Sequence, residues 1–368
     1  MDGIYFPGIG IFMDKVPEYF NVFGFKLTIY AIAITLGFVL ALLIASKEAR
    51  RTGQDDENYL DFFLVLVIPA ILGARIYYIL FNLGRFIQPG KSIGQTIMDM
   101  INIRNGGLAV YGGLIAGVTA AFFFTKKKKI YLPLFGDTIA MGVLIGQILG
   151  RWGNFFNREA YGAYTSGPLR MAIPINHFSI MTQSYLQENN ILTEEMLQNK
   201  EMVKGVACFT VHPTFLYEMV WNIMLLLLIF FYRKKKKFDG ELAMMYVAGY
   251  GLGRFFIEAL RTDSLMIGPL KVSQVVAVLC VIVAMAVIIK NRLDIKNGKT
   301  PKINFAGEGG KKPEDDSQND VDNKIEDKQK DSQEDNQKDN QDSNLEKDSE
   351  SDSESDPESD PEEKESAE

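Results

Sequence analysis

Residues 27–45 read LTIYAIAITLGFVLALLIA, a run of nineteen residues without a single charged side chain. A helix needs about 20 mostly apolar residues to cross the hydrocarbon core of a bilayer. Six further runs of this kind follow, and we expect each to form a membrane-spanning helix: residues 60–82, 108–124, 134–149, 213–232, 242–260 and 273–290. The sequence therefore predicts an all-α integral membrane protein with about seven transmembrane helices.

The C-terminal 68 residues differ sharply from this apolar body. Residues 301–368 carry 9 basic and 25 acidic side chains, a net charge of −16, whereas residues 1–300 have a net charge of +9. The tail is rich in Asp, Glu, Ser, Asn and Gln, and it holds too little apolar surface to fold. We expect a membrane domain at residues 1–299 and a disordered acidic tail at residues 300–368. An ordinary soluble globule is excluded.

Cysteines and histidines are scarce. The two cysteines are Cys208 and Cys280, and Cys280 lies inside an apolar run, so a disulfide scaffold is excluded. The two histidines are His177 and His212, and none of these residues stands at metal-ligand spacing. We expect no metal site.

Basic residues predict the orientation of the chain. With seven spans, four basic groups fall on one side of the membrane: Lys47, Arg50 and Arg51; Lys126–Lys129; Arg233–Lys237; and Lys290–Lys299. Short loops rich in Lys and Arg stay in the cytoplasm. We therefore expect the N-terminus outside, the tail in the cytoplasm and residues 160–211 as a small external head. The segment before the first apolar run has Asp14 and Glu18 beside Lys15 and Lys26, and the run's positive charge follows it, which disfavours a cleavable signal peptide.

The sixth predicted span contains GYGLGRFFIEALR, residues 249–261. At about 100° per residue, Tyr250, Arg254, Glu258 and Arg261 share one face near the outer end of this helix. A structural ion pair between Arg254 and Glu258 is the simpler explanation. A second arginine on the same face favours a functional site instead.

The fourth span ends in GRWGNFFNREAYG, residues 150–162. This stretch places Arg151, Asn154, Asn157 and Glu159 within nine residues. An interfacial helix end with a snorkelling arginine is the alternative. The density of amides, charges and glycines favours a site.

The outer ends of the other spans also carry polar side chains, which are Tyr30, Arg75, Arg104, Asn105, Tyr111, His212, Tyr217 and Glu218. Ionisable groups at membrane depth usually face a protein interior or cavity. Arginine suits phosphate recognition, so Arg75, Arg151, Arg254 and Arg261 predict a pocket for an anionic lipid headgroup. His212, Glu218, Glu258 and Tyr111 are candidates for proton transfer.

Three other classes of protein remain to be weighed against a lipid-acting enzyme. A transporter would use the same arginines at the midplane, but the charges gather at one end and no matching halves with broken helices appear. A non-catalytic assembly or receptor protein would depend on residues 160–211 instead. An intramembrane protease is disfavoured, because no Ser/His or paired-Asp arrangement appears at matching depth.

The stretch GRWGNFFNREAYG resembles the signature of bacterial prolipoprotein diacylglyceryl transferases, Gly-Arg-x-Gly-Asn-Phe-x-Asn-x-Glu-x-x-Gly. The matching positions are Gly150, Arg151, Gly153, Asn154, Phe155, Asn157, Glu159 and Gly162. The GLAVYGG, HPTFLYE and GYGLGRFFIEALR stretches resemble further parts of this family in the same order, over roughly residues 20–290.

This resemblance implies a seven-helix transferase of the bacterial plasma membrane that works without a cofactor. Its substrates would be phosphatidylglycerol and prolipoprotein signal peptides with a lipobox cysteine, and membrane lipids would surround it. The diacylglyceryl group would pass to the cysteine as a thioether, releasing glycerol 1-phosphate, in the first step of lipoprotein maturation. We expect a monomer that binds no nucleic acid.

The resemblance also implies roles for individual residues. Arg151 would bind phosphatidylglycerol beside Asn154 and Glu159, Arg254 and Glu258 would form a second essential pair, and Tyr30 would be the tyrosine of the first helix. We add Arg75 and Arg261 as lipid-binding candidates, and Tyr111 and His212 as catalytic ones.

One position departs from the pattern. Some family members have a histidine, given a role in catalysis, where this chain has Tyr111. A tyrosine, with an ordinary pKa near 10, is a poor base. Glu159, Glu258 or His212 could instead take the proton of the precursor's thiol, or the arginines could help the thiol to ionise.

Overall fold

The computed structural model describes residues 3–103 and 106–299, which belong to one compact unit, Met1–Lys312. A second unit, Pro313–Glu368, lies wholly among residues that the structure does not describe. The prediction of a disordered tail at residues 300–368 therefore falls outside the described residues, and so do Arg104 and Asn105.

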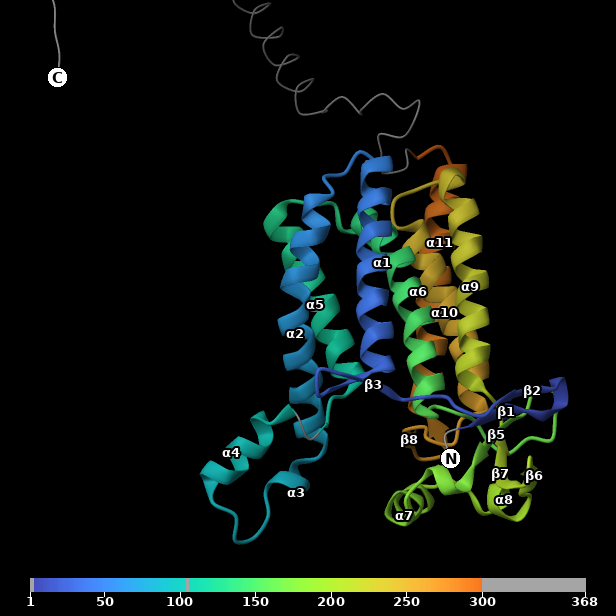
Figure 1. The fold of residues 1–368 in the computed structure, drawn as a ribbon. Helices are drawn as coiled ribbons and strands as arrows, with labels where there is room; N and C mark the ends of the chain where they lie inside the picture. Colours follow the sequence, from blue (N-terminus) through green and yellow to red (C-terminus); the bar gives the residue numbers. More distant parts are fainter. Residues whose placement is uncertain (1–2, 104–105, 300–368) are drawn as a thin grey trace, which may run out of the picture. The chain divides into compact units, whose positions relative to one another are not determined.

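Seven long helices dominate the described part of the chain (Figure 1). Each overlaps one of the seven predicted ranges: α1 (Ile29–Arg51), α2 (Glu57–Phe81), α5 (Val110–Lys128), α6 (Leu132–Asn157), α9 (Thr214–Tyr232), α10 (Glu241–Ala259) and α11 (Val272–Lys296). Among the residues described, five of them, α1, α2, α6, α9 and α11, are long and apolar enough to cross a membrane. The helix α10 is less apolar because it carries Glu241, Arg254 and Glu258.

The seven helices run up and down in alternation and pack as neighbouring pairs. The closest pairs are α1 with α6, α2 with α5, α10 with α11, and α6 with α9. The α2–α5 pair packs on itself more than on α1 or α6 (Figure 1). Small residues on α1 that face its neighbours, Ala33, Gly37, Ala41 and Ala45, are buried, which allows close approach between helices.

A five-stranded antiparallel sheet lies at one end of the helices, and the expectation of an all-α chain did not include it (Figure 1). Its order is β2-β1-β5-β7-β6, with β1 (Ile4–Phe6), β2 (Ile11–Met13), β5 (Met171–Pro174), β6 (Glu201–Val203) and β7 (Val206–Val211). The two N-terminal strands join three strands from the predicted head segment, with Tyr5 opposite Ala172. Two short helices, α7 (Ile180–Glu188) and α8 (Glu194–Gln198), complete this head.

The core of the head continues into the helices. Buried side chains from the sheet, among them Ile4, Met171 and Phe209, form one cluster with Phe155 of α6 and Phe215 of α9. The sheet therefore fixes the last turn of α6 and the first turn of α9, which are the segments that carry the signature residues.

Smaller elements lie at the same end of the helices as the sheet. They are the hairpins β3 (Tyr19–Val22) with β4 (Phe25–Thr28) and β8 (Met266–Ile267) with β9 (Leu270–Lys271), and the short helices α3 (Leu83–Phe86) and α4 (Ile93–Ile101). The side chain of Thr28 caps α1 by accepting a hydrogen bond from the Ala31 N–H.

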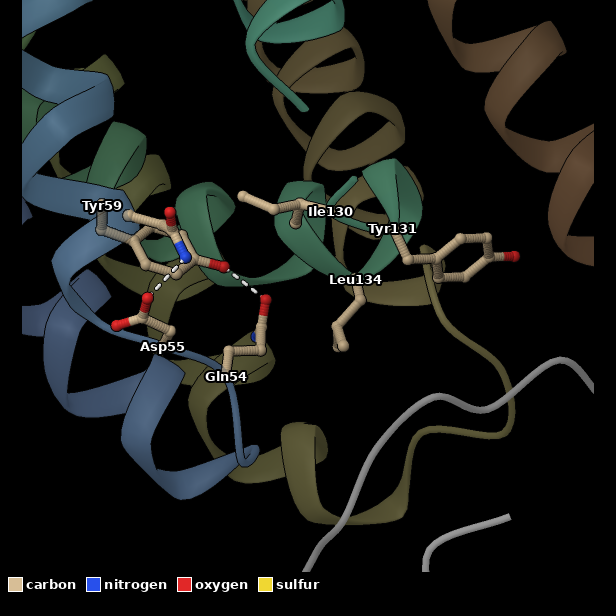
Figure 2. Close-up of a pocket in the computed structure, with 7 residues that line it drawn as sticks. Gln54, Asp55, Tyr59, Ile130, Tyr131 and Leu134 are labelled. Carbon is tan, nitrogen blue, oxygen red and sulfur yellow. Dashed lines mark hydrogen bonds between the residues drawn. The ribbon is translucent and has the colours of Figure 1, made fainter. Parts of the chain in front are cut away.

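The opposite end, which we call the basic-loop end, holds the C-termini of α1, α5, α9 and α11. A cavity of about 220 Å³ opens there between the start of α2 and the start of α6 (Figure 2). Tyr59 stacks on Phe135 and donates a hydrogen bond to Gln54, whose amide reaches Thr138. This polar chain ties the α1–α2 turn to α6. The cavity lies at the far end of α6 from Arg151.

Candidate functional site

The signature residues lie at the C-terminal end of α6 and in the turn that follows. Arg151 and Asn154 are on the last two turns, and Arg151 Nη1 donates to Asn154 Oδ1 at 2.9 Å. The helix continues past the predicted limit at residue 149 to Asn157 and stops at Arg158, which has a φ of +52°. The turn brings Glu159 back, so that Asn154 and Asn157 both donate to Glu159 Oε1, at 2.9 and 3.3 Å.

Glu218, in the second turn of α9, joins the two arginines of the predicted site. Its carboxylate accepts from Arg151 Nη2 at 2.6 Å, from Arg254 Nη1 at 3.1 Å and from the Tyr250 hydroxyl at 3.2 Å. Glu218 is 2% exposed, whereas the arginine side chains are 19% and 18% exposed. A buried carboxylate therefore holds two partly accessible guanidinium groups from two other helices.

Arg254 has a second acidic partner on its own helix. Its Nη2 lies 2.5 Å from Glu258 Oε2, one turn further along α10. The ion pair that the sequence predicted is therefore present, and Glu258 is 2% exposed. Together, Arg151, Glu218, Arg254 and Glu258 form a connected row of alternating charge, which we call the arginine cluster.

Both arginines of the cluster keep N–H groups with no protein acceptor among the residues described. Arg151 donates one hydrogen bond from each terminal nitrogen, whereas Arg254 donates one from Nη1 and forms an ion pair through Nη2. Within the described residues their Nε–H and the remaining terminal N–H groups stay available. Guanidinium groups with spare donors bind phosphate oxygens in a bidentate manner. The cluster is thus chemically suited to an anionic phosphate ester.

Arg75, predicted for the same pocket, is not brought to the cluster. All five of its N–H donors bond to backbone carbonyls, and these belong to Asp99, Met100, Asn102, Gly106 and Gly107. The side chain is buried against Tyr78 and Phe86. Arg75 therefore holds the segment between α4 and α5, and no donor is left for a lipid.

Tyr30 packs against Gly153, the glycine of the GNFFN stretch. A Cβ at Gly153 would collide with the Tyr30 ring, so only glycine admits this ring against α6. Tyr30 is 38% exposed. The structure therefore brings Tyr30 of α1 beside the end of α6 that carries Arg151 and Asn154.

Gly162, the last signature position, lies where three segments cross. Its N–H donates to His212 O at 2.8 Å, and the neighbouring Ala163 N–H donates to Leu260 O at 2.7 Å. A Cβ at Gly162 would lie 2.6 Å from Leu260 O. This glycine therefore lets the segment after α6 link the start of α9 to the end of α10.

His212 and Arg261 flank this crossing. The Nδ1 atom of His212 lies 3.3 Å from the Tyr217 hydroxyl, and burial lowers the pKa of His212 below its ordinary value. Arg261 follows the end of α10 and bonds Asp263 through Nε at 2.9 Å and Nη2 at 2.6 Å. The Arg261 N–H donates to the carbonyl of Glu258 at 3.1 Å. In the described ranges neither the His212 nor the Arg261 side chain has a hydrogen bond to a side chain of the cluster.

Tyr111 begins the first turn of α5, on the other side of the bundle from α9. Its hydroxyl lies 2.6 Å from Ser273 Oγ at the start of α11. Within the described residues it has no hydrogen bond to the arginine cluster.

The structure also shows a role that the sequence did not reveal. The sequence placed Glu218 only among candidates for proton transfer, yet its carboxylate is the common partner of Arg151 and Arg254. The available signal was a carboxylate in an otherwise apolar helix at the same depth as the arginines. In the described ranges no group of three or more His, Cys, Asp or Glu side chains could hold a metal ion.

These observations define a class of protein. Several membrane-length helices, with arginines and carboxylates from three of them gathered at one end, indicate a polytopic membrane protein that handles an anionic lipid.

Comparison with known proteins identifies the family. Residues 17–290 match the family model described as prolipoprotein diacylglyceryl transferase. The chain is similar to proteins named phosphatidylglycerol–prolipoprotein diacylglyceryl transferase from Clostridioides difficile strain 630, 37% identical over 73% of this chain and 92% of the relative, and from Clostridium novyi strain NT, 36% identical over 78% and 99%. A Bacillus cereus strain 03BB102 protein of the same name is 36% identical over 72% and 87%. The chain belongs to the prolipoprotein diacylglyceryl transferase family, and the predicted resemblance is confirmed.

Proposed function

We propose that this protein transfers the diacylglyceryl group of phosphatidylglycerol to the lipobox cysteine of prolipoproteins. The sulfur forms a thioether bond to C3 of the diacylglyceryl unit. The C3–O bond breaks, and glycerol 1-phosphate leaves with the electron pair. The relatives' names supply the substrates, and the observation that carries the proposal is the pair of partly accessible guanidinium groups fixed by one buried carboxylate.

Arg151 and Arg254 hold the phosphate in this mechanism. Their spare N–H groups bind its oxygens, and the same contacts stabilise the charge that develops on the leaving glycerol phosphate. Asn154 orients Arg151. Glu159 accepts hydrogen bonds from both signature asparagines, Asn154 and Asn157, and so keeps the turn closed. Arg261, beside the cluster, and Tyr30, beside Gly153, complete the lipid-binding face.

The thiol of the precursor must lose its proton as sulfur attacks. Glu159, Glu258 and His212 are the candidate acceptors. Burial favours the neutral form of His212, so its imidazole is able to accept a proton at neutral pH. Glu258 is already bound to Arg254, which makes it a weaker base.

We further propose that all seven long helices span the membrane and that the arginine cluster lies towards the outer leaflet. The basic residues of the loops between α1 and α2, α5 and α6, and α9 and α10, and those at the end of α11, gather at the end opposite the cluster. Loops of this kind stay in the cytoplasm. The sheet, the N-terminus and the cluster then face outside, where an exported precursor arrives.

A transfer assay tests the proposal. Purified protein is incubated with phosphatidylglycerol labelled in its acyl chains and a peptide that bears a lipobox cysteine. Label should move to the peptide, and prior alkylation of the peptide cysteine should prevent the transfer. Absence of transfer, with labelled lipid moving between leaflets instead, would contradict the proposal and support a transporter.

The cysteines of the protein itself do not interfere with this alkylation control. Cys208 is buried in the head, and burial raises its pKa to about 11. A protonated, buried thiol reacts slowly with alkylating reagents. Peptide alkylated and purified before the assay also leaves the protein untouched.

A further inference from the structure

Four side chains at the starts of α5 and α11 connect the α2–α5 pair of helices to the α10–α11 pair. These two pairs otherwise have few contacts with each other. Tyr111 reaches from α5, Lys271 and Gln274 reach α10, and Ser273 lies between them along the chain. None of these contacts involves a side chain of the arginine cluster. The inference drawn from these contacts rests on the function proposed above and concerns how the cluster is held in position.

The start of α11 holds the end of α10 through backbone carbonyls. Lys271 Nζ donates to the carbonyls of Glu258 at 2.7 Å and Arg261 at 2.6 Å. Gln274 Nε2 donates to the carbonyl of Phe255 at 3.1 Å. The last carbonyls of a helix have no partner within the helix, and a lysine there also complements the helix dipole.

These carbonyls belong to the turn that carries the second half of the cluster. Phe255 directly follows Arg254, and Glu258 itself provides one of the accepting carbonyls. The placement of the Arg254 and Glu258 side chains therefore depends on where the first turn of α11 sits.

Tyr111 fixes that turn from the other side. Its hydroxyl and Ser273 Oγ are 2.6 Å apart, although the residues are 162 positions apart in the sequence. The α2–α5 pair otherwise packs mainly on itself. This bond thus anchors the α10–α11 pair to the α2–α5 pair at the level of the cluster.

We propose that Tyr111 is a positioning residue, whose hydroxyl holds Ser273 and through it the α10 turn that presents Arg254 and Glu258 to the phosphate of the lipid. The hydroxyl faces another neutral hydroxyl, and in the described ranges no carboxylate or imidazole bonds to it. It therefore takes no proton from the substrate and acts through the geometry of Arg254.

A double-mutant cycle tests this assignment. Tyr111→Phe, Ser273→Ala and the double variant are compared with wild type in the transfer assay, with phosphatidylglycerol and peptide varied separately. Each single variant should raise the KM for phosphatidylglycerol about three- to tenfold, as expected for one hydrogen bond. The KM for the peptide and the pH profile should not change.

The double variant is the decisive measurement. Because both single changes remove the same bond, the double variant should resemble either single one instead of multiplying their effects. Ser273→Thr, which keeps the hydroxyl, should retain the wild-type KM. Gln274→Ala should raise the KM for the lipid independently of Tyr111, because it loosens the same turn through another bond.

Matched controls come from α7, where Ser184 and the 60%-exposed Tyr185 are adjacent. Tyr185→Phe and Ser184→Ala should leave every constant unchanged. Thermal unfolding in detergent identifies variants that do not fold, and Gln274→Ala then tests the position of the α10 turn through its own hydrogen bond.

Two results would overturn the assignment. Loss of more than about a hundredfold in kcat for Tyr111→Phe, with Ser273→Ala near wild type, would place Tyr111 on the reacting atoms. Unchanged lipid KM in both single variants would show that the bond positions nothing. Wild-type protein without any transfer would instead contradict the proposed function itself.

Discussion

Both ends of the helix bundle bury carboxylates, and two of those at the basic-loop end, Asp137 and Glu241, are neutralised differently from Glu218 at the arginine end. At the basic-loop end, Asp137 accepts hydrogen bonds from the backbone N–H groups of Gly240 and Ala243, each at 2.9 Å, in addition to Lys236. Glu241 likewise accepts from the Lys237 N–H. At the arginine end, the donors to Glu218 among the described residues are all side chains, those of Arg151, Tyr250 and Arg254.

The difference separates a network bonded through the backbone from one built on side-chain donors. Backbone donors are fixed by the fold, so Asp137 and Glu241 lock the α9–α10 loop against α6 and α11. The donors to Glu218 are side chains that keep further N–H groups available within the described residues. Such groups can bind a phosphate without breaking the fold, which supports the proposal that substrate binds at this end.

Removing an arginine from each end should give the largest contrast. Arg151→Ala should lower transfer by at least about a hundredfold, because a preorganised donor to the leaving group is lost. Arg233→Ala, at the basic-loop end, removes a 2.5 Å contact with Glu48 but leaves Arg51 as its partner. That variant should unfold at a lower temperature and keep its activity per folded molecule.

Both variants are scored by the transfer assay and by thermal unfolding in detergent, with membrane insertion checked by fractionation. Near-normal transfer by inserted Arg151→Ala protein would refute the assignment of the cluster. Equal loss of activity in Arg233→Ala would show that the two ends do not differ in the way described.

Neutralising one carboxylate at each end tests the contrast more finely. Glu218→Gln keeps the shape but removes the charge that both guanidinium groups share, and kcat/KM should fall about ten- to a hundredfold. Asp137→Asn leaves one backbone N–H short of an acceptor, and the free energy of unfolding should fall by about 1–3 kcal/mol. A Glu218→Gln variant that is merely less stable, with full activity, would move Glu218 into the structural group.

Local sequence patterns predicted the helices well because each apolar run carries its own signal. All seven predicted ranges overlap helices that the structure shows. The helix α6 was predicted to stop at residue 149, since polar residues follow. It continues to Asn157 because partners from elsewhere, Glu218 above all, satisfy Arg151.

The sheet was missed for the opposite reason. Its strands are three to six residues long, and neighbours in the sheet come from distant parts of the chain, as with Ile4–Phe6 beside Met171–Pro174. Such pairing leaves no periodic signal within either segment alone.

The candidate site shows the same difference between features set by local sequence and features set by distant parts of the chain. Arg151, Asn154 and Glu159 were grouped correctly, because the spacing along one helix and its turn sets their geometry. Arg75 was placed in the pocket by its depth alone, which does not tell which way a side chain faces. Its actual partners are carbonyls at the end of α4 and in the loop that follows, and a sequence pattern does not display these.

Adding a methyl group at each of two glycines of α6 should show whether the helix packs tightly at the arginine end and more loosely nearer its middle. Gly153→Ala forces a Cβ into the Tyr30 ring, whereas no heavy atom lies within 4 Å of a Cβ at Gly146. We expect Gly153→Ala to lower kcat/KM about tenfold through displaced Tyr30 and Arg151. Gly146→Ala should leave activity unchanged and add slight stability from helix propensity. Equal activities in the transfer assay would show that Tyr30 packing does not set the cluster.

The smallest expected effect concerns pH, and it too is confined to the arginine end. Both histidines of the chain, His177 and His212, lie in or beside the head. Burial lowers the pKa of His212 below 6.5, so more than half of its rings stay neutral at pH 6.5. If neutral His212 accepts the thiol proton, kcat/KM should rise with pH through this lowered pKa, and lowering the pH from 7.5 to 6.5 should cost less than about twofold. This acid limb should persist in His177→Gln, whose imidazole contacts Glu18 and Phe178 in the head, and vanish from the residual activity of His212→Gln. An unchanged limb in His212→Gln would assign the proton to Glu159 or Glu258, and a limb centred above pH 6.5 would contradict a buried imidazole as the base.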